Sequence, residues 1–133
     1  MKFTVPDAKQ VIDAISDDIS LNIFAMIKSK SVNREDLRDE FDMSNKQCYD
    51  RIAKLIDTGL IVRKNGYYSI TSFGNVVFQA QAKIGKAVQN QSKLKIVDAI
   101  RNTGLPKDEL TKLIDDLIDD YELSQIILRD NSN

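Results

Sequence analysis

The stretch "MSNKQCYDRIAKLIDTGLI", residues 43–61, decides how the rest of the chain can be interpreted. Ser44 and Gln47 have the S-x-x-Q spacing of a capping box, in which each side chain accepts the other residue's backbone N–H at the start of a helix. Gly59 stands where a glycine commonly ends a helix. The spacing therefore predicts a helix over residues 45–58. Its apolar face consists of Cys48, Ile52, Leu55 and Ile56, and its other faces are polar. The helix either covers a core only, or also presents a polar surface to a partner.

Three shorter helices are predicted upstream of this stretch. The first covers residues 7–15, directly after a proline. The second is expected to be capped by Ser16, to carry two aspartates in its first turn and to run to about Ser29. The third is expected to be capped by Asn33 and to end near Glu40.

Downstream, the period of the apolar residues changes from 3.6 to 2 in "LIVRKNGYYSIT", residues 60–71. Asn65-Gly66 is the strongest short hairpin signal in the chain. A two-residue turn fixes the register, pairing Ile61 with Ile70, Val62 with Ser69, Arg63 with Tyr68 and Lys64 with Tyr67. Tyr68 is expected to be more buried than Tyr67.

The C-terminal half of the sequence predicts long helices. Thr71 is expected to cap a helix whose apolar residues recur at four- and three-residue steps as far as Leu94. A helix over 92–102 and a single final helix over 107–128 are predicted to follow. The apolar stripe can pack within the chain or against a second copy, and we prefer the second alternative. The predicted dimer interface consists of Phe73, Val77, Ala80, Ile84, Ala87, Leu94, Leu113 and Leu117.

The charge of the chain is unevenly distributed. The 133 residues carry a net charge of −1, which by itself does not favour a nucleic acid as partner. Residues 44–95, however, hold nine Lys and Arg against two Asp, a local net charge of +7 between acidic segments. Phosphate contacts depend on local Lys and Arg rather than on total charge, so this segment can bind a polyanion. The ordinary solvated outer faces of helices would give the same pattern.

Several kinds of chemistry lack the residues that they need. The sequence has no histidine and one cysteine, so the usual general base, the Ser/Cys–His pairs and the commonest metal ligand are missing. We therefore expect no catalytic site, no metal and no cofactor. Cys48 lies on an apolar helix face, so packing is preferred to a redox role. No apolar run approaches the roughly 20 residues of a membrane span, and no secretory signal is visible. A cytoplasmic protein without membrane contact is expected.

The order of the elements is that of a winged helix-turn-helix. The expected fold class is mainly α with a small β-hairpin, with a DNA-binding domain over residues 1–71 and a helical dimerisation region over residues 72–133. In this arrangement the second of the paired helices enters the major groove of double-stranded DNA, while the wing touches the flanking backbone. Asn and Gln can read adenine, Lys and Arg guanine, and a carboxylate cytosine. The candidate DNA-binding residues are Ser44, Asn45, Lys46, Gln47, Tyr49, Asp50, Arg51 and Lys54 on the helix, and Arg63, Lys64, Asn65 and Gly66 on the wing.

A longer stretch, "DLRDEFDMSNKQCYDRIAKLIDTGLIVRKNGYYSITSFG", residues 36–74, resembles the winged-helix domains of MarR/ArsR-type prokaryotic regulators. The resemblance is carried by Ser44, Leu55, the Gly59-Leu60-Ile61 step, Gly66, and the run Tyr68-Ser69-Ile70-Thr71 that leads to Gly74. Less specifically, nearly the whole chain is similar to a group of small archaeal winged-helix proteins described as predicted transcriptional regulators.

This resemblance implies a homodimer that binds partly palindromic double-stranded DNA and regulates transcription, often as a repressor. ArsR-type proteins commonly sense metals through Cys or His clusters, which this sequence lacks, so metal sensing is not implied here. The alternative function is a winged helix that binds another protein and no DNA.

Overall fold

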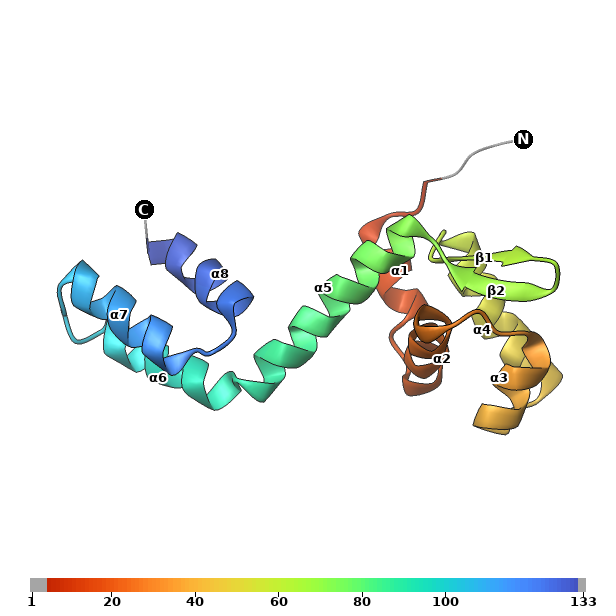
Figure 1. Cartoon of the computed structure of the whole chain (residues 1–133), viewed down its shortest axis with the longest axis horizontal. Coiled ribbons are helices and arrows are strands. Elements are labelled where there is room, and N and C mark those ends of the chain that lie inside the picture. The colour runs from red at the N-terminus through yellow and green to blue at the C-terminus, as the bar shows by residue number, and fades with distance from the viewer. Residues whose placement is uncertain (1–4, 132–133) are drawn as a thin grey trace. The chain divides into compact units, whose positions relative to one another are not determined.

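The computed structural model describes residues 5–131, with side chains up to residue 129, and Figure 1 shows its elements. This part of the chain is mainly helical with one small antiparallel hairpin, as the sequence predicts. The elements are α1 (Ala8–Ala14), α2 (Asp18–Ser29), α3 (Arg34–Phe41), α4 (Asn45–Asp57), β1 (Ile61–Lys64), β2 (Tyr67–Ile70), α5 (Ser72–Gln89), α6 (Gln91–Arg101), α7 (Lys107–Leu117) and α8 (Tyr121–Asn131). The chain forms two compact units, Met1–Gln79 and Ala80–Asn133, and each has its own apolar core.

The predicted capping box at the start of α4 is confirmed. The backbone N–H of Gln47 donates to Oγ of Ser44, and the backbone N–H of Ser44 donates to Oε1 of Gln47, both at 3.2 Å. The helix ends at Asp57, with Thr58 as its C-cap, and Gly59 follows with a φ of +80°. This left-handed backbone conformation favours glycine, because glycine has no Cβ that would clash with the backbone.

The start of α2 differs from the prediction, because Asp17 and not Ser16 caps this helix. Oδ2 of Asp17 accepts the backbone N–H of Ser20 at 3.2 Å. The Ser16 hydroxyl instead donates to the carbonyl oxygen of Asp13 at 2.8 Å, at the end of α1. Ser16 therefore closes the preceding helix, and the neighbouring carboxylate, an equally good cap, begins the next one.

The hairpin has the predicted register, from Ile61 opposite Ile70 to Lys64 opposite Tyr67. Its two turn residues, Asn65 and Gly66, have φ values of +53° and +82°, as a tight hairpin turn requires. A contact that the sequence did not reveal holds the hairpin to the segment between α2 and α3. Val32 and Tyr68 exchange two backbone hydrogen bonds, of 3.2 and 2.7 Å.

The core of the first unit is formed mainly by α2, α3, α4 and the hairpin. Its buried apolar residues are Val11, Ala14, Ile23, Phe24, Ile27, Val32, Leu37, Cys48, Ile52, Leu55, Leu60, Ile61 and Tyr68. The beginning of α5 also packs on this core, since the rings of Phe24 and Phe78 meet edge to face with centroids 5.8 Å apart. Gly74 lies so close to Leu60, the residue before β1, that a Cβ would overlap the carbonyl oxygen of Leu60. The boundary between the units consequently falls within α5 rather than at residue 71.

The second unit has more, shorter helices than the sequence predicted. α5 stops at Gln89. At Asn90 the backbone leaves the helical conformation, and the side-chain amide of this residue donates to the carbonyl oxygen of Lys86. The predicted final helix is broken at Ile118, which is extended, and α8 starts anew. Oδ1 of Asp120 accepts the backbone N–H of Leu123 at 3.1 Å, the contact by which an N-cap aspartate begins a helix.

Three ion pairs hold the α7–α8 junction against α5 and α6 within the second unit. They join Lys83 to Glu122 at 3.4 Å, Lys86 to Asp120 at 3.3 Å and Lys93 to Asp119 at 3.7 Å. The hydrogen bond from the backbone of Leu123, together with Lys86, lowers the pKa of Asp120. Across residues 5–131 no helix is both long and apolar enough to cross a membrane.

Candidate nucleic-acid interface

The helix α4 has the two faces that the sequence predicts. Cys48, Ile52 and Leu55 are buried in the core of the first unit. The candidate contact residues Ser44, Asn45, Lys46, Gln47, Tyr49, Asp50 and Lys54 are all exposed. Burial raises the pKa of the Cys48 thiol, although the charges of Arg34 and Arg38 act in the opposite direction. The thiol therefore packs, and the polar face of α4 is free to meet a partner.

The two amides of this face already have partners in the protein. Oδ1 of Asn45 accepts a hydrogen bond from Nη1 of Arg38 at 2.6 Å, and Oε1 of Gln47 accepts the capping-box N–H of Ser44. An amide oxygen can accept two hydrogen bonds, so neither partner removes all of its capacity. If Asn45 or Gln47 binds adenine through both its amide oxygen and its amide nitrogen, the oxygen must either give up its intramolecular hydrogen bond or accept a second one.

Arg51 has a place in the packing of the helices. Its side chain is only 25% exposed, its Nε lies 3.2 Å from Oδ2 of Asp17, and its Nη1 donates to the carbonyl oxygen of Gln47. Hydrogen bonding from Ser20, with Arg51 as a further contributor, lowers the pKa of Asp17 to about 2. Arg51 thus joins α4 to the start of α2, which leaves it less available to a ligand than its neighbours.

The remaining cations of α4 and the hairpin are unpaired. Lys46, Lys54, Arg63 and Lys64 are exposed and make no ion pair or side-chain hydrogen bond with any residue that the structure describes. By contrast, Arg51 and the three lysines at the α7–α8 junction are paired with carboxylates. Within residues 44–95, the Lys and Arg side chains that no described carboxylate pairs therefore lie mainly on α4 and β1.

The hairpin exposes its predicted contact residues. Arg63, Lys64, Asn65 and Gly66 are exposed, whereas Tyr68 is 2% exposed and Tyr67 48% exposed. The expectation that Tyr68 is the more buried of the two tyrosines is confirmed. Tyr67 is the aromatic residue of the hairpin that a partner can reach.

The two arginines of α3 were not among the predicted contact residues, because they fall in a segment that is acidic overall. Arg34 and Arg38 are spaced four residues apart and lie half-buried on one side of the helix. Together with Arg63 they line a hollow of about 340 Å³, to which Asn33, Glu35, Gly66 and Tyr68 also contribute. We call it the arginine hollow. The i, i+4 spacing beside buried Leu37 is the one sequence signal that could have marked this pair.

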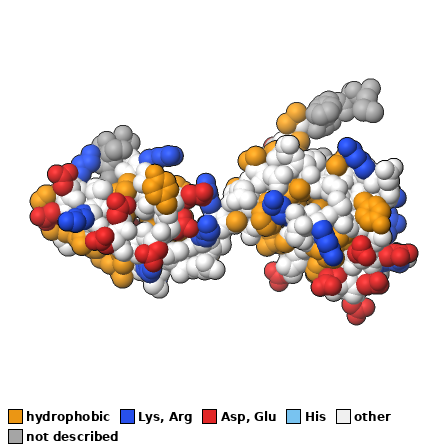
Figure 2. Space-filling view, in the orientation of Figure 1, with side chains coloured by type: hydrophobic (Ala, Val, Ile, Leu, Met, Phe, Trp, Pro, Cys, Tyr) orange, Lys and Arg blue, Asp and Glu red, His pale blue; other side chains and the backbone are white. Residues whose placement is uncertain are grey.

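The other surface of α3 is acidic. Glu35, Asp36, Asp39 and Glu40 are exposed, and Figure 2 shows acidic side chains gathered over this part of the first unit. Lys and Arg side chains appear in the same view toward the hairpin. Apart from Glu35, which also lines the arginine hollow, the two signs of charge are thus separated across one short helix.

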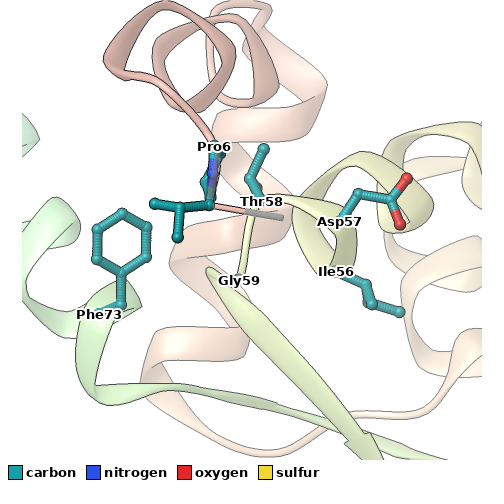
Figure 3. Close-up of a pocket in the computed structure, with 7 residues that line it drawn as sticks. Pro6, Ile56, Asp57, Thr58, Gly59 and Phe73 are labelled. Atoms are coloured by element: carbon teal, nitrogen blue, oxygen red, sulfur yellow. The ribbon is translucent and has the colours of Figure 1, made fainter. Parts of the chain in front are cut away.

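An apolar pocket of about 440 Å³ opens on the first unit at the C-terminal end of α4. It is lined by Val5, Pro6, Ile56, Asp57, Thr58, Gly59 and Phe73. In Figure 3, Phe73 and Ile56 lie on opposite sides of Gly59. Ile56, which the sequence assigned to the core face, is in fact partly exposed and helps to form this pocket.

The predicted interface residues divide into two groups. Val77 packs on the core of the first unit, and Ala87, Leu94 and Leu117 pack on the core of the second. These four residues therefore pack within the chain, which is the alternative to dimerisation that the sequence left open. Phe73, Ala80, Ile84 and Leu113 remain exposed. The neighbouring Val76 and Val88 of α5, which the sequence stripe did not include, are exposed as well.

Comparison of the chain with protein-family profiles, with curated proteins and with solved structures found no match. Among the described residues, no three His, Cys, Asp or Glu side chains are grouped so that they could hold a metal ion.

Proposed function

We propose that the first unit is a winged helix-turn-helix that binds double-stranded DNA and regulates transcription in the cytoplasm. The observation that carries this proposal is the exposed polar face of α4, which has no role in the core and lies beside unpaired cations on α4 and β1. α3 and α4 are packed against each other and joined by a short turn, which is the arrangement that a helix-turn-helix needs.

In the proposed complex α4 enters the major groove, which is wide enough for one helix. Its first turns carry Lys46, which can contact guanine, and Asp50, which can accept from cytosine. Asn45 and Gln47 can contact adenine with the hydrogen-bonding capacity that their intramolecular partners leave. Arg63 and Lys64 contact phosphates next to the groove and hold the register of the protein on the duplex.

The second part of the proposal is that the protein acts as a homodimer through α5. Val76, Ala80, Ile84 and Val88 recur every fourth residue and are all exposed. Four such residues on one helix form an apolar stripe that a second copy could cover. Two reading helices would then bind half-sites separated by about one helical turn of DNA, roughly 34 Å, or a multiple of it.

A protein-binding winged helix is the second candidate function. The acidic surface of α3 and the apolar pocket beside Phe73 are the observations that favour it, because neither suits a contact with phosphates. This candidate predicts that the chain selects no DNA and that a protein partner can be recovered from the source cells.

Selection from a random pool of duplexes tests the proposal directly. We expect enrichment of a partly palindromic sequence, and binding that weakens steeply as salt rises, because phosphate contacts release counterions. The same experiment with the Lys46→Ala variant should enrich sequences with a weaker base preference at the position that Lys46 contacts. A pool that stays random after repeated rounds would contradict DNA reading and leave the protein-binding candidate.

A further inference from the structure

The arginine hollow is lined by three arginines from two elements of the first unit. Arg34 and Arg38 come from α3, and Arg63 comes from β1. A second hollow, of about 220 Å³, shares Arg34, Arg63 and Tyr68 with the first and extends along α4 as far as Tyr49 and Ile56. The cluster therefore lies between the proposed wing and the proposed reading helix.

The charge of this cluster is not balanced by the protein. None of the three arginines forms an ion pair with a described residue, although Glu35 lines the same hollow. The Nε atoms of Arg34 and Arg38 are buried and have no hydrogen-bond partner in the described part of the chain. Buried donors normally have an acceptor, so two arginines that line one hollow and each keep an unsatisfied donor indicate a site for an anion.

We propose that the arginine hollow binds a phosphate group. Guanidinium groups present paired N–H donors that match the oxygens of phosphate, and three of them offset the repulsion from one carboxylate. A phosphodiester of the DNA backbone and a free phosphate share this chemistry. The assignment to DNA rests on the proposed function, whereas the phosphate site itself does not.

One contact connects this site to the reading of bases. Nη1 of Arg38 donates to Oδ1 of Asn45, the first residue of α4, at 2.6 Å. A phosphate in the hollow offers Arg38 a charged acceptor, which binds a guanidinium more strongly than a neutral amide does. When Arg38 turns to the phosphate, the amide of Asn45 becomes free to meet a base. Backbone binding would in this way prepare the reading helix.

The test uses the full chain and two variants, Arg34→Gln and Arg38→Gln, with Lys112→Gln on the second unit as the matched control. Binding to a 20-base-pair duplex is measured between 50 and 200 mM salt. Loss of one phosphate contact should weaken binding about five- to tenfold near 0.1 M salt and reduce the salt slope by about 0.9. The control should bind like the wild type. Arg34→Lys keeps the charge without the forked donors and should lie between wild type and Arg34→Gln.

A second measurement is independent of DNA. Sodium phosphate is titrated against sodium chloride at equal ionic strength, and the arginine Nε–Hε signals are followed by two-dimensional NMR. Shifts of two arginine signals, abolished in Arg34→Gln and Arg38→Gln but not in the control, support the site even if no DNA is bound. A duplex effect without such shifts assigns the site to DNA phosphates alone. The inference is overturned if the folded variants retain the wild-type salt slope and phosphate moves no arginine signal, whether or not the chain binds DNA.

Discussion

The double variant Arg63→Ala, Lys64→Ala tests the role of the hairpin most directly. Both side chains are exposed and unpaired within the described chain, so their removal should change the free energy of unfolding by less than about 0.5 kcal/mol. Each phosphate contact that is lost lowers the salt slope by about 0.9 and, near 0.1 M salt, the affinity by about eightfold. Two contacts per protomer therefore predict, for each protomer bound to the duplex, a slope lower by about 1.8 and binding about 60-fold weaker, equivalent to about 2.4 kcal/mol.

Fluorescence anisotropy with a labelled duplex, repeated at several salt concentrations, measures both quantities. The matched control is Lys107→Ala, Lys112→Ala, which removes the same charge from exposed positions on α7 of the second unit. If both double variants weaken binding equally, the effect comes from net charge and the hairpin has no specific role. If the hairpin variant binds like the wild type, the placement of the wing on the DNA backbone is wrong.

Four further outcomes are expected. Stability should fall as pH drops from about 4 toward 2, because the pKa of Asp17 is lowered from 3.8 to about 2 in the folded state; the effect should be below about 1 kcal/mol for so exposed a group. Thermal melts of Asp17→Asn, which keeps a good cap, should lack this acid-dependent step. In urea titrations Gly74→Ala should destabilise by about 1–3 kcal/mol, whereas Gly85→Ala, where a Cβ meets open space, should not. Gln47→Ala should relax base preference by about 1–3 kcal/mol at one position in a duplex-selection assay, and unchanged preference would move the reading surface elsewhere. Ile84→Asp should give monomers in sedimentation velocity, and an unchanged mass would place self-association off α5.

The parts of the fold that were predicted correctly depend on interactions between residues close in sequence. The Ser44/Gln47 capping box spans one helical turn, and the Asn65-Gly66 turn sets the register of strands that adjoin it. In both cases the local hydrogen bonds determine the backbone. Tertiary packing favours the same backbone conformations that these local hydrogen bonds favour.

The break between α7 and α8 shows where periodicity fails. The apolar residues between 107 and 128 keep a helical spacing across the break, so the pattern predicts one helix. The structure instead ends α7 before Ile118, which stays buried in an extended conformation, while Asp120 caps α8. A side chain that competes for the backbone N–H groups can end a helix whose apolar pattern continues.

The contacts that build the candidate site were not predictable from spacing. Val32 pairs with Tyr68, and Asp17 with Arg51, across more than thirty residues. The arginine hollow likewise joins α3 to β1. No local pattern encodes such pairs, because they depend on how the helices pack. Sequence reasoning therefore found the polar face of α4 but missed the arginines beside it.

The distribution of charge has a further consequence for how a duplex could approach the first unit. Unpaired cations lie on α4 and β1, whereas the helical spacing places the exposed carboxylates of Asp36, Asp39 and Glu40 on other sides of α3 than Arg34 and Arg38. A duplex centred on α4 meets the cations, and a duplex tilted toward the acidic side of α3 brings its phosphates toward these three carboxylates. Like charges at short range oppose the second orientation, and this repulsion weakens as salt screens it. In the proposed complex, the acidic surface of α3 thus favours a single orientation of the protein on DNA at low salt.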